Sequence, residues 1–169
     1  QEAPHRVIIF VGSKKKTKEL AISIIRAGYN ARAMHSDLTQ AERDEVTYLF
    51  RSGKIDILVA TDIVARGIDI DDIAIVINFD VPHDEEDYVH RIGRTARAGR
   101  GGRAVTLVND KDMYSFRQIE RFLGKEIYKE QMPEEFGETP AYHSKAKQKR
   151  NFRHYHNKKK GKNGTKPNR

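Results

Sequence analysis

Three arginines at intervals of three residues, Arg91, Arg94 and Arg97, form the group in this sequence best suited to binding an anion. They follow an acidic stretch at residues 84–87 (DEED), which is typical of the first turn of a helix. With helical spacing, Arg94 and Arg97 would lie on one side and could converge on a single anion. A solvated basic helix face is the alternative interpretation.

Glycines surround these arginines at four positions, namely Gly93, Gly99, Gly101 and Gly102. Glycine weakens a helix, so a residue pattern rich in glycine does not serve helix stability. The clustering therefore favours an anion site over a simple helix face.

The elements that must position this group alternate between short apolar runs and amphipathic segments. We expect strands at residues 6–12, 30–35, 55–62, 72–80 and 102–108. We expect helices at residues 14–28, 36–53, 84–92 and 110–123. This alternation predicts an α/β fold in which right-handed βαβ units build a parallel sheet flanked by helices. Ligands of such sheets bind beyond the carboxyl ends of the strands, so one rim should carry the function.

Capping residues support two of the helices. Ser13 can cap the first, and Thr39 with Glu42 forms a capping box for the second. Gly28 and Gly53 are the expected stops. The predicted core-facing residues of three helices are Leu20, Ile24 and Ala27, then Val46, Leu49 and Phe50, and finally Met113, Phe116, Ile119 and Phe122.

The net charge of +8 is concentrated at the C-terminal end. Residues 141–169 contain 11 of the 32 Lys and Arg and no acidic residue, which leaves 21 basic and 24 acidic residues in 1–140. From about residue 134 the apolar periodicity fails, although Tyr142, Phe152 and Tyr155 are present. We therefore predict a globular domain at 1–133 and a disordered basic tail at 134–169.

Several classes of protein are excluded or disfavoured by composition. The chain has no cysteine, so it has neither a disulfide framework nor a thiolate metal site, which fits a reducing compartment. No apolar run approaches about 18 residues, so we expect no membrane span. The opening QEAPHR is neither an initiator methionine nor a signal peptide, so we expect a piece of a longer, cytoplasmic protein.

Four stretches together resemble the second RecA-like domain of DEAD-box RNA helicases: RVIIFVGSKKKT (6–17), MHSDLTQAER (34–43), ATDIVARGIDI (60–70) and HRIGRTARAG (90–99). They occur in the family's order over residues 6–109. His90 favours DEAD-box proteins over related helicases that have glutamine there. A compact core with a basic, aromatic-containing tail is similar to the bacterial RhlE type. The resemblance implies a RecA-like, three-layer fold.

For ATP, the resemblance implies that Arg94 and Arg97 are arginine fingers that reach the γ-phosphate. Planar guanidinium groups stabilise the charge that spreads over phosphoryl oxygens in the transition state. Buried ion pairs with Asp62 or Asp69 are the alternative. Asp69 matches the carboxylate that binds the ATP ribose, with Gly67 allowing close approach and Arg66 beside it. Asp69 could instead be a turn residue.

For RNA, the resemblance assigns backbone contacts to Thr61, Arg43, Ser36 and Ser13, with Gln40 supporting Arg43. Thr61 could instead be a local cap, and a helix cap is an equal alternative for Ser13. Ser36 stands where many family members have glycine.

His90 and Arg91 match residues that couple the ATP and RNA sites. The alternative for His90 is a histidine packed under Tyr88.

The sequence lacks a GxxxxGK[ST] loop, a DEAD tetrapeptide and Ser-Ala-Thr. The resemblance therefore implies that ATP and Mg²⁺ are held mainly by an N-terminal RecA-like domain that this chain does not contain, and that this chain alone is inactive.

The resemblance further implies that the partner is RNA, bound with little sequence specificity, that no membrane is involved, and that the protein is a monomer. The tail should bind RNA or, alternatively, aid solubility. Two rival functions are a non-catalytic RNA-binding module and half of a DNA-directed superfamily 2 helicase.

Overall fold

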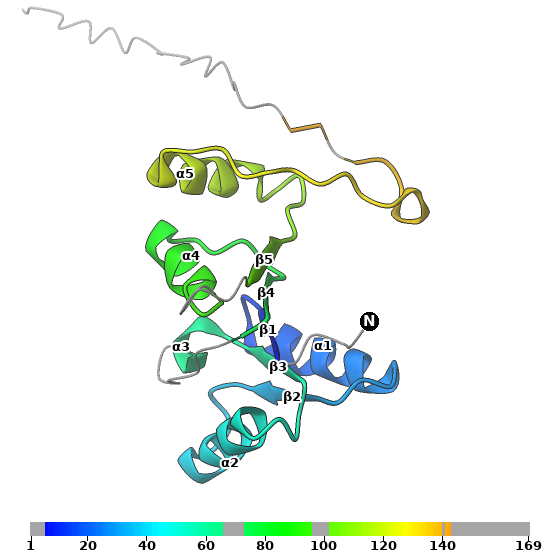
Figure 1. Cartoon of the computed structure of the whole chain (residues 1–169), viewed down its shortest axis with the longest axis vertical. Coiled ribbons are helices and arrows are strands. Elements are labelled where there is room, and N and C mark those ends of the chain that lie inside the picture. Colours follow the sequence, from blue (N-terminus) through cyan, green and yellow to red (C-terminus); the bar gives the residue numbers. More distant parts are fainter. Residues whose placement is uncertain (1–5, 66–72, 96–101, 140, 143–169) are drawn as a thin grey trace, which may run out of the picture.

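A single parallel sheet organises the molecule (Figure 1). The computed structural model describes residues 6–65, 73–95, 102–139 and 141–142. The sheet has the strand order β2-β3-β1-β4-β5. Its strands are β1 (Val7–Phe10), β2 (Ala31–Met34), β3 (Ile57–Ala60), β4 (Ile75–Asn78) and β5 (Arg103–Thr106). All five expected strands are confirmed, as is the parallel α/β class.

The helices are α1 (Lys14–Arg26), α2 (Gln40–Arg51), α3 (Asp62–Ala65), α4 (Glu85–Ile92) and α5 (Met113–Leu123), followed by the 3₁₀ turn η1 (Glu134–Phe136). In Figure 1, α1 lies on one side of the sheet, and α3 and α4 lie on the other. Four of these helices match the expected ones, whereas α3 was not predicted because its four residues are too few to show a helical period.

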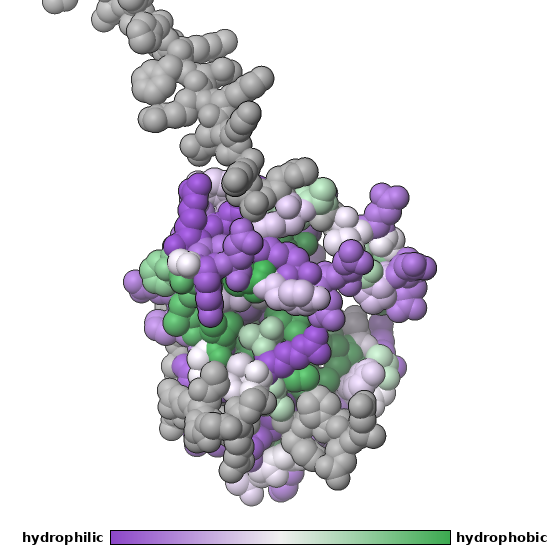
Figure 2. All heavy atoms as spheres, turned by 45° about the horizontal axis from the view of Figure 1, so that its top comes forward, coloured by the Kyte–Doolittle hydropathy of each residue, from purple (hydrophilic) through white to green (hydrophobic). Residues whose placement is uncertain are grey.

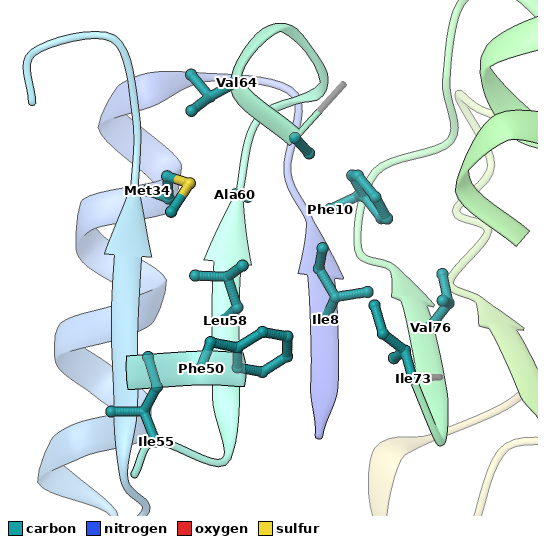
Figure 3. Close-up of a cluster of buried hydrophobic side chains, with 11 residues drawn as sticks. Ile8, Phe10, Met34, Phe50, Ile55, Leu58, Ala60, Val64, Ile73 and Val76 are labelled. Carbon is teal, nitrogen blue, oxygen red and sulfur yellow. The ribbon is translucent and has the colours of Figure 1, made fainter. Parts of the chain in front are cut away.

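Alternation along the central strand β1 divides the core into two layers. Ile8 and Phe10 join the larger cluster with Phe50 of α2 and Val64 of α3 (Figure 3). Ile9 belongs to the opposite cluster, with Ala21 of α1. Successive strand residues point to opposite faces, so a strand buried on both faces needs an unbroken apolar run. The run at residues 7–11 meets that requirement.

Capping geometry sets the helix ends as predicted. The Ser13 hydroxyl accepts from the Lys16 amide at 3.3 Å, and Thr39 with Glu42 forms the complete capping box. Gly28 and Gly53 follow α1 and α2 with φ of +91° and +69°, a region that side chains disfavour.

Two of the predicted apolar faces are partly wrong. Ala27 is exposed as the C-cap of α1, and Thr17 and Ala21 are buried instead. On α5, Phe122 is exposed, whereas Leu123 packs in the core. Adjacent helical residues are about 100° apart, so the stripe centred on Phe116 and Ile119 includes Leu123 and excludes Phe122.

Tyr142, which lies within the segment predicted to be a disordered tail, packs against α5. Its ring packs edge-on against Phe116 of α5, with 6.0 Å between ring centroids, and its hydroxyl donates to Glu120. Glu120 is buried and also accepts from Lys129 and from the Ile127 amide. Burial would raise the pKa of Glu120, but these hydrogen bonds lower it below its ordinary value. Packing therefore extends beyond the predicted boundary at 133.

The surface of the domain mixes charged and apolar side chains. In the space-filling view of Figure 2, hydrophilic side chains cover much of the visible face and apolar ones gather in patches between them. Within the described ranges, no helix combines the length and the hydropathy that crossing a membrane requires. The remainder of the predicted tail, residues 143–169, lies outside the described residues.

Phe50 is fully buried between α2 and the sheet, so its replacement tests the core. We expect Phe50→Ala to lower the free energy of unfolding by about 3–5 kcal/mol because it leaves a cavity. Urea unfolding followed by circular dichroism measures this. Phe136→Ala, at an exposed position, is the control and should change stability by under about 0.5 kcal/mol. Equal losses in the two variants would contradict the assigned core.

Candidate functional site

Several of the predicted site residues lie at or just after the carboxyl ends of the strands. Because the strands are parallel and in register, Phe10 lies beside Ala60 and Asn78, and Met34 lies beside Ala60. The segments that follow these strand ends carry Ser13, Ser36, Thr61 and Asp80. The expected single rim is therefore present.

Arg91 of α4 is the centre of this rim. Its side chain is only 3% exposed, and it makes a two-point ion pair with Asp62 through Nε–Oδ1 at 2.6 Å and Nη2–Oδ2 at 2.7 Å. Nη1 donates to the Asn78 side chain at 3.1 Å and to the Asp80 carbonyl at 2.9 Å. The guanidinium carbon lies 5.0 Å from the Phe10 ring centroid. Arg91 therefore joins α4 to the ends of β1, β3 and β4.

This pairing bears on one alternative from the sequence. Both carboxylate oxygens of Asp62 accept from Arg91, so Arg91 is the partner of Asp62 among the described residues, whereas Arg97 and Asp69 lie outside them. Because the Arg91 side chain is almost fully buried, it fixes the positions of its neighbours at the rim.

Asp80 extends the network to the start of α1. Its Oδ2 accepts from the Gly12 amide at 2.8 Å, and its Oδ1 accepts from Lys16 Nζ at 2.7 Å. Burial would raise the pKa of Asp80, but Lys16 and the Gly12 amide lower it. A Cβ at position 12 would lie 3.3 Å from Oδ2, so glycine allows the close approach. Asn78 and Asp80 are not among the residues predicted from sequence, although polar residues at the end of the apolar run IVINFD (75–80) are a signal for them.

Arg94 lies just beyond α4, where the helix tightens. The Arg94 amide donates to the Arg91 carbonyl at 3.2 Å, and the Arg94 carbonyl accepts from the Ile73 amide at 3.4 Å. Thr95 anchors the same segment by donating its hydroxyl to the Ile73 carbonyl at 2.7 Å. The half-buried side chain of Arg94 lines a small open pocket, together with Phe10, Asp62, Ala65, Asp87, His90 and Arg91.

His90 is exposed and lines this pocket, so the alternative of a histidine packed under Tyr88 is wrong. The physical reason is that Tyr88 turns into the α4–α5 core with Phe116, and a residue two positions later lies on a different helix face.

The residues expected to bind RNA occupy the other half of the rim. Arg43 Nη2 donates to the Ser36 carbonyl at 3.3 Å, which brings these two together. Gln40 does not extend to Arg43: its amide donates to Asp44 at 2.8 Å, one turn along the same helix. The Thr61 carbonyl accepts from the Val64 and Ala65 amides and so begins α3. The helix-cap interpretation of Ser13 is confirmed.

Two buried nitrogens in this half lack hydrogen-bond partners among the described residues, namely His35 Nδ1 and Arg43 Nε. Burial, and then the nearby Lys18 ammonium, lowers the pKa of His35 below its ordinary value. Arg66, Gly67, Asp69 and Arg97 lie outside the described residues. In the part of the chain that is described, no group of three or more His, Asp or Glu could hold a metal ion.

Breaking the Arg91–Asp62 pair tests the centre of the rim. Arg91→Met leaves the Asp62 carboxylate, which is 24% exposed, without its partner, and we expect a loss of about 3 kcal/mol in the free energy of unfolding. Urea unfolding provides the measurement. The double variant Arg91→Met/Asp62→Asn should lose less than the sum of the single variants because the uncompensated charge is gone. Additive losses would contradict the pairing.

The lowered pKa of His35 predicts a dependence of stability on pH. The unfolded chain takes up a proton at this residue near pH 6.5, before the folded chain does. The contribution is therefore fully favourable above about pH 6.5 and declines as the pH falls toward the lowered folded pKa. NMR titration of His35 and urea unfolding from pH 7.5 to 5 measure it. His35→Gln should reduce the decline, whereas His83→Gln, at an exposed position, should not; a His35 midpoint above 6.5 would refute the assignment.

Three comparisons with known proteins agree with the family resemblance of the sequence motifs. Residues 1–99 match the family described as the helicase conserved C-terminal domain. The ATP-dependent RNA helicase CshA of Listeria monocytogenes is 46% identical over 132 residues, which cover 78% of this chain and 25% of that protein. The chain thus spans about a quarter of the length of this curated relative.

Two solved structures share the fold. The E. coli DEAD-box protein SrmB, bound to regulator of ribonuclease activity A, is 40% identical with a TM-score of 0.71, and the match covers 75% of each chain. A variant of S. cerevisiae Dbp5 bound to RNA and ADP BeF3 is 36% identical with a TM-score of 0.67, and the match covers 73% of this chain and 33% of that one. With its RecA-like sheet and its arginine-centred rim, the chain belongs to the helicase C-terminal domain family, as a domain of the DEAD-box type.

Proposed function

We propose that this domain is the C-terminal motor half of an ATP-dependent RNA helicase that separates short RNA duplexes or remodels RNA–protein complexes. One observation carries the proposal: parallel strands bring Ser13, Ser36 and Thr61 to the same rim as the pocket lined by Arg94. RNA contacts and a nucleotide contact can therefore be made by one rigid edge.

ATP would lie between this rim and an N-terminal RecA-like domain of the same protein, which would hold most of the nucleotide and Mg²⁺. Arg94 and Arg97 donate hydrogen bonds from their guanidinium groups to the γ-phosphate. At the other end of the nucleotide, Asp69 binds the ribose, with Gly67 and Arg66 beside it. The fit of Arg94 rests on its place in the rim pocket, with its main chain tied to Arg91 and Ile73. With its main chain fixed in this way, Arg94 can present its planar guanidinium from the pocket, and such a group stabilises developing phosphoryl charge.

RNA would cross the other half of the rim, where Arg43 and Ser36 are already joined. Contacts of this kind go to phosphates and 2′-hydroxyls, so they carry little sequence preference. Affinity of both ligands for the closed arrangement of the two domains couples their binding. The Dbp5 relative, which was solved with RNA and ADP BeF3, supports this pairing of ligands. His90, exposed at the pocket, and the buried Arg91 transmit the state of one half to the other, and Gln40 stiffens α2.

The setting that fits this function is a monomeric, cytoplasmic protein whose basic residues 143–169 tether RNA. Bacterial RhlE-type helicases are the narrower class that the tail composition favours.

The role of Arg94 is tested in the whole protein. We expect Arg94→Ala to lower RNA-stimulated ATP turnover by about 10³-fold or more, because an arginine finger acts in the transition state. A coupled phosphate-release assay measures turnover, and thermal unfolding checks that the fold persists. Arg26→Ala, at an exposed position in the last turn of α1, is the charge-matched control and should keep full turnover. The 169-residue chain alone should hydrolyse no ATP; turnover by that chain would refute the division of labour.

The tether is tested by removing residues 143–169 and keeping Tyr142, which packs on α5. All 11 basic residues of the segment 141–169 are lost in this deletion. We expect the slope of log affinity against log salt to flatten by several units, since each phosphate contact releases about one counterion. The slope is measured by fluorescence anisotropy with a single-stranded RNA, and an unchanged slope would show that these residues do not tether RNA.

A further inference from the structure

Two lysines at the start of α1 share one carboxylate from a neighbouring loop. Lys14 Nζ lies 2.7 Å from Asp37 Oδ1, and Lys18 Nζ lies 2.8 Å from Asp37 Oδ2. The two lysines are one helical turn apart, so their side chains lie on the same face of α1. The hydrogen bonds from Lys14 and then Lys18 lower the pKa of Asp37 to about 2, so the carboxylate stays charged at neutral pH.

This group lies directly beside the residues proposed to bind RNA. Asp37 follows Ser36, whose carbonyl accepts from Arg43, and Arg43 Nε is buried without a hydrogen-bond partner among the described residues. Lys14 also follows Ser13 at the start of α1. The lysine pair therefore extends the row of donors from α2 across to α1.

Exposure separates this ion pair from the other carboxylate of the rim. The side chains of Lys14, Lys18 and Asp37 are 50%, 45% and 43% exposed, whereas Asp80 is 23% exposed and also accepts from a backbone amide. Ion pairs in contact with water contribute little to stability, so exchanging one anion for another costs little. Phosphate oxygens accept from ammonium groups as carboxylate oxygens do.

We propose that Lys14 and Lys18 form a further RNA-phosphate site and that Asp37 occupies it until a phosphodiester displaces the carboxylate. In the free domain, Asp37 holds both ammonium groups at the edge of the rim and prevents their pairing elsewhere. In the RNA complex, the two ammonium groups bind the phosphate next to the one held at Ser36 and Arg43. This inference rests on the proposed function, since it takes RNA as the ligand of the rim.

Whether Asp37→Asn strengthens or weakens RNA binding distinguishes a displaceable carboxylate from one that holds the loop in place. Asp37→Asn keeps the shape and removes the competing charge, so displacement predicts tighter RNA binding by about 2- to 5-fold. A clamp that orders the loop for RNA predicts weaker binding. Glu19→Gln is the matched control because it removes one exposed acidic charge from α1, the helix that carries the two lysines, where Glu19 Oε1 lies 3.9 Å from Lys15 Nζ.

A second pair of variants tests the lysines. Lys14→Gln/Lys18→Gln should flatten the slope of log affinity against log salt by about 1–2 units, as the loss of phosphate contacts does. Lys15→Gln/Arg26→Gln removes the same charge from exposed positions of α1 and should change the slope by less than half as much. The measurements use the 169-residue chain and a single-stranded decauridylate, followed by fluorescence anisotropy over a salt series.

NMR of the side chains distinguishes failure of this site from failure of the proposed function. If both hold, decauridylate shifts the Arg43 Nε–H resonance and the Lys14 and Lys18 side-chain resonances. If Arg43 shifts and the two lysines do not, the lysine site is overturned and the helicase proposal is unaffected. If none of the three shifts, the RNA surface proposed for this rim is itself wrong. Tighter binding by Glu19→Gln equal to that of Asp37→Asn would also overturn the displacement.

Discussion

The rim of this domain depends on the burial of one charged group, the Arg91 guanidinium. A buried charge is tolerated only when its donors are paired, because removal from water costs several kcal/mol that partial pairing does not recover. Arg91 meets this condition with Asp62, which follows β3, and with Asn78 and the Asp80 carbonyl, which lie at and just after the end of β4. The pairing can be complete only when β3, β4 and α4 are in their native positions. The ion pair therefore selects one arrangement of the rim.

The network around Arg91 also fixes the position of its neighbours in the rim. Arg94 follows Arg91 by three residues, and its main chain is tied both to the end of α4 and to Ile73 at the start of the β4 segment. Asp80 fixes the β1–α1 junction as well, because its carboxylate accepts from the Gly12 amide and from Lys16. The rim thus has a buried, fixed half around Arg91 and a more exposed half around Asp37. Groups that must act on a transition state suit the first half, and groups that must exchange partners suit the second.

Several of the interpretations made from sequence depended on local rules, and these held. Ser13, Thr39 with Glu42, and Gly28 lie at helix ends because capping is decided within a few residues. Other assignments depended on which neighbour a side chain meets in the folded domain. The sequence prediction places Phe122 in the core, but Phe122 is exposed and Leu123 packs there, and Tyr142, from the segment predicted to be a tail, packs on the same α4–α5 cluster. Gln40 was assigned to support Arg43, but Asp44, on the same helix, is its partner.

Sequence by itself determined the alternation of strands and long helices, the helix ends and part of the rim, because each follows from a period of two, a period of 3.6 or a short motif. Only the tertiary structure decided which arginine takes Asp62, that Asp80 joins Gly12 to Lys16, and that Asp37 lies between Lys14 and Lys18. These pairings link residues 19 to 68 positions apart, and several arginines and lysines compete for each carboxylate. The sequence spacing of these residues does not decide which basic residue pairs with which carboxylate. The register of the parallel strands does, because it determines which strand ends lie side by side.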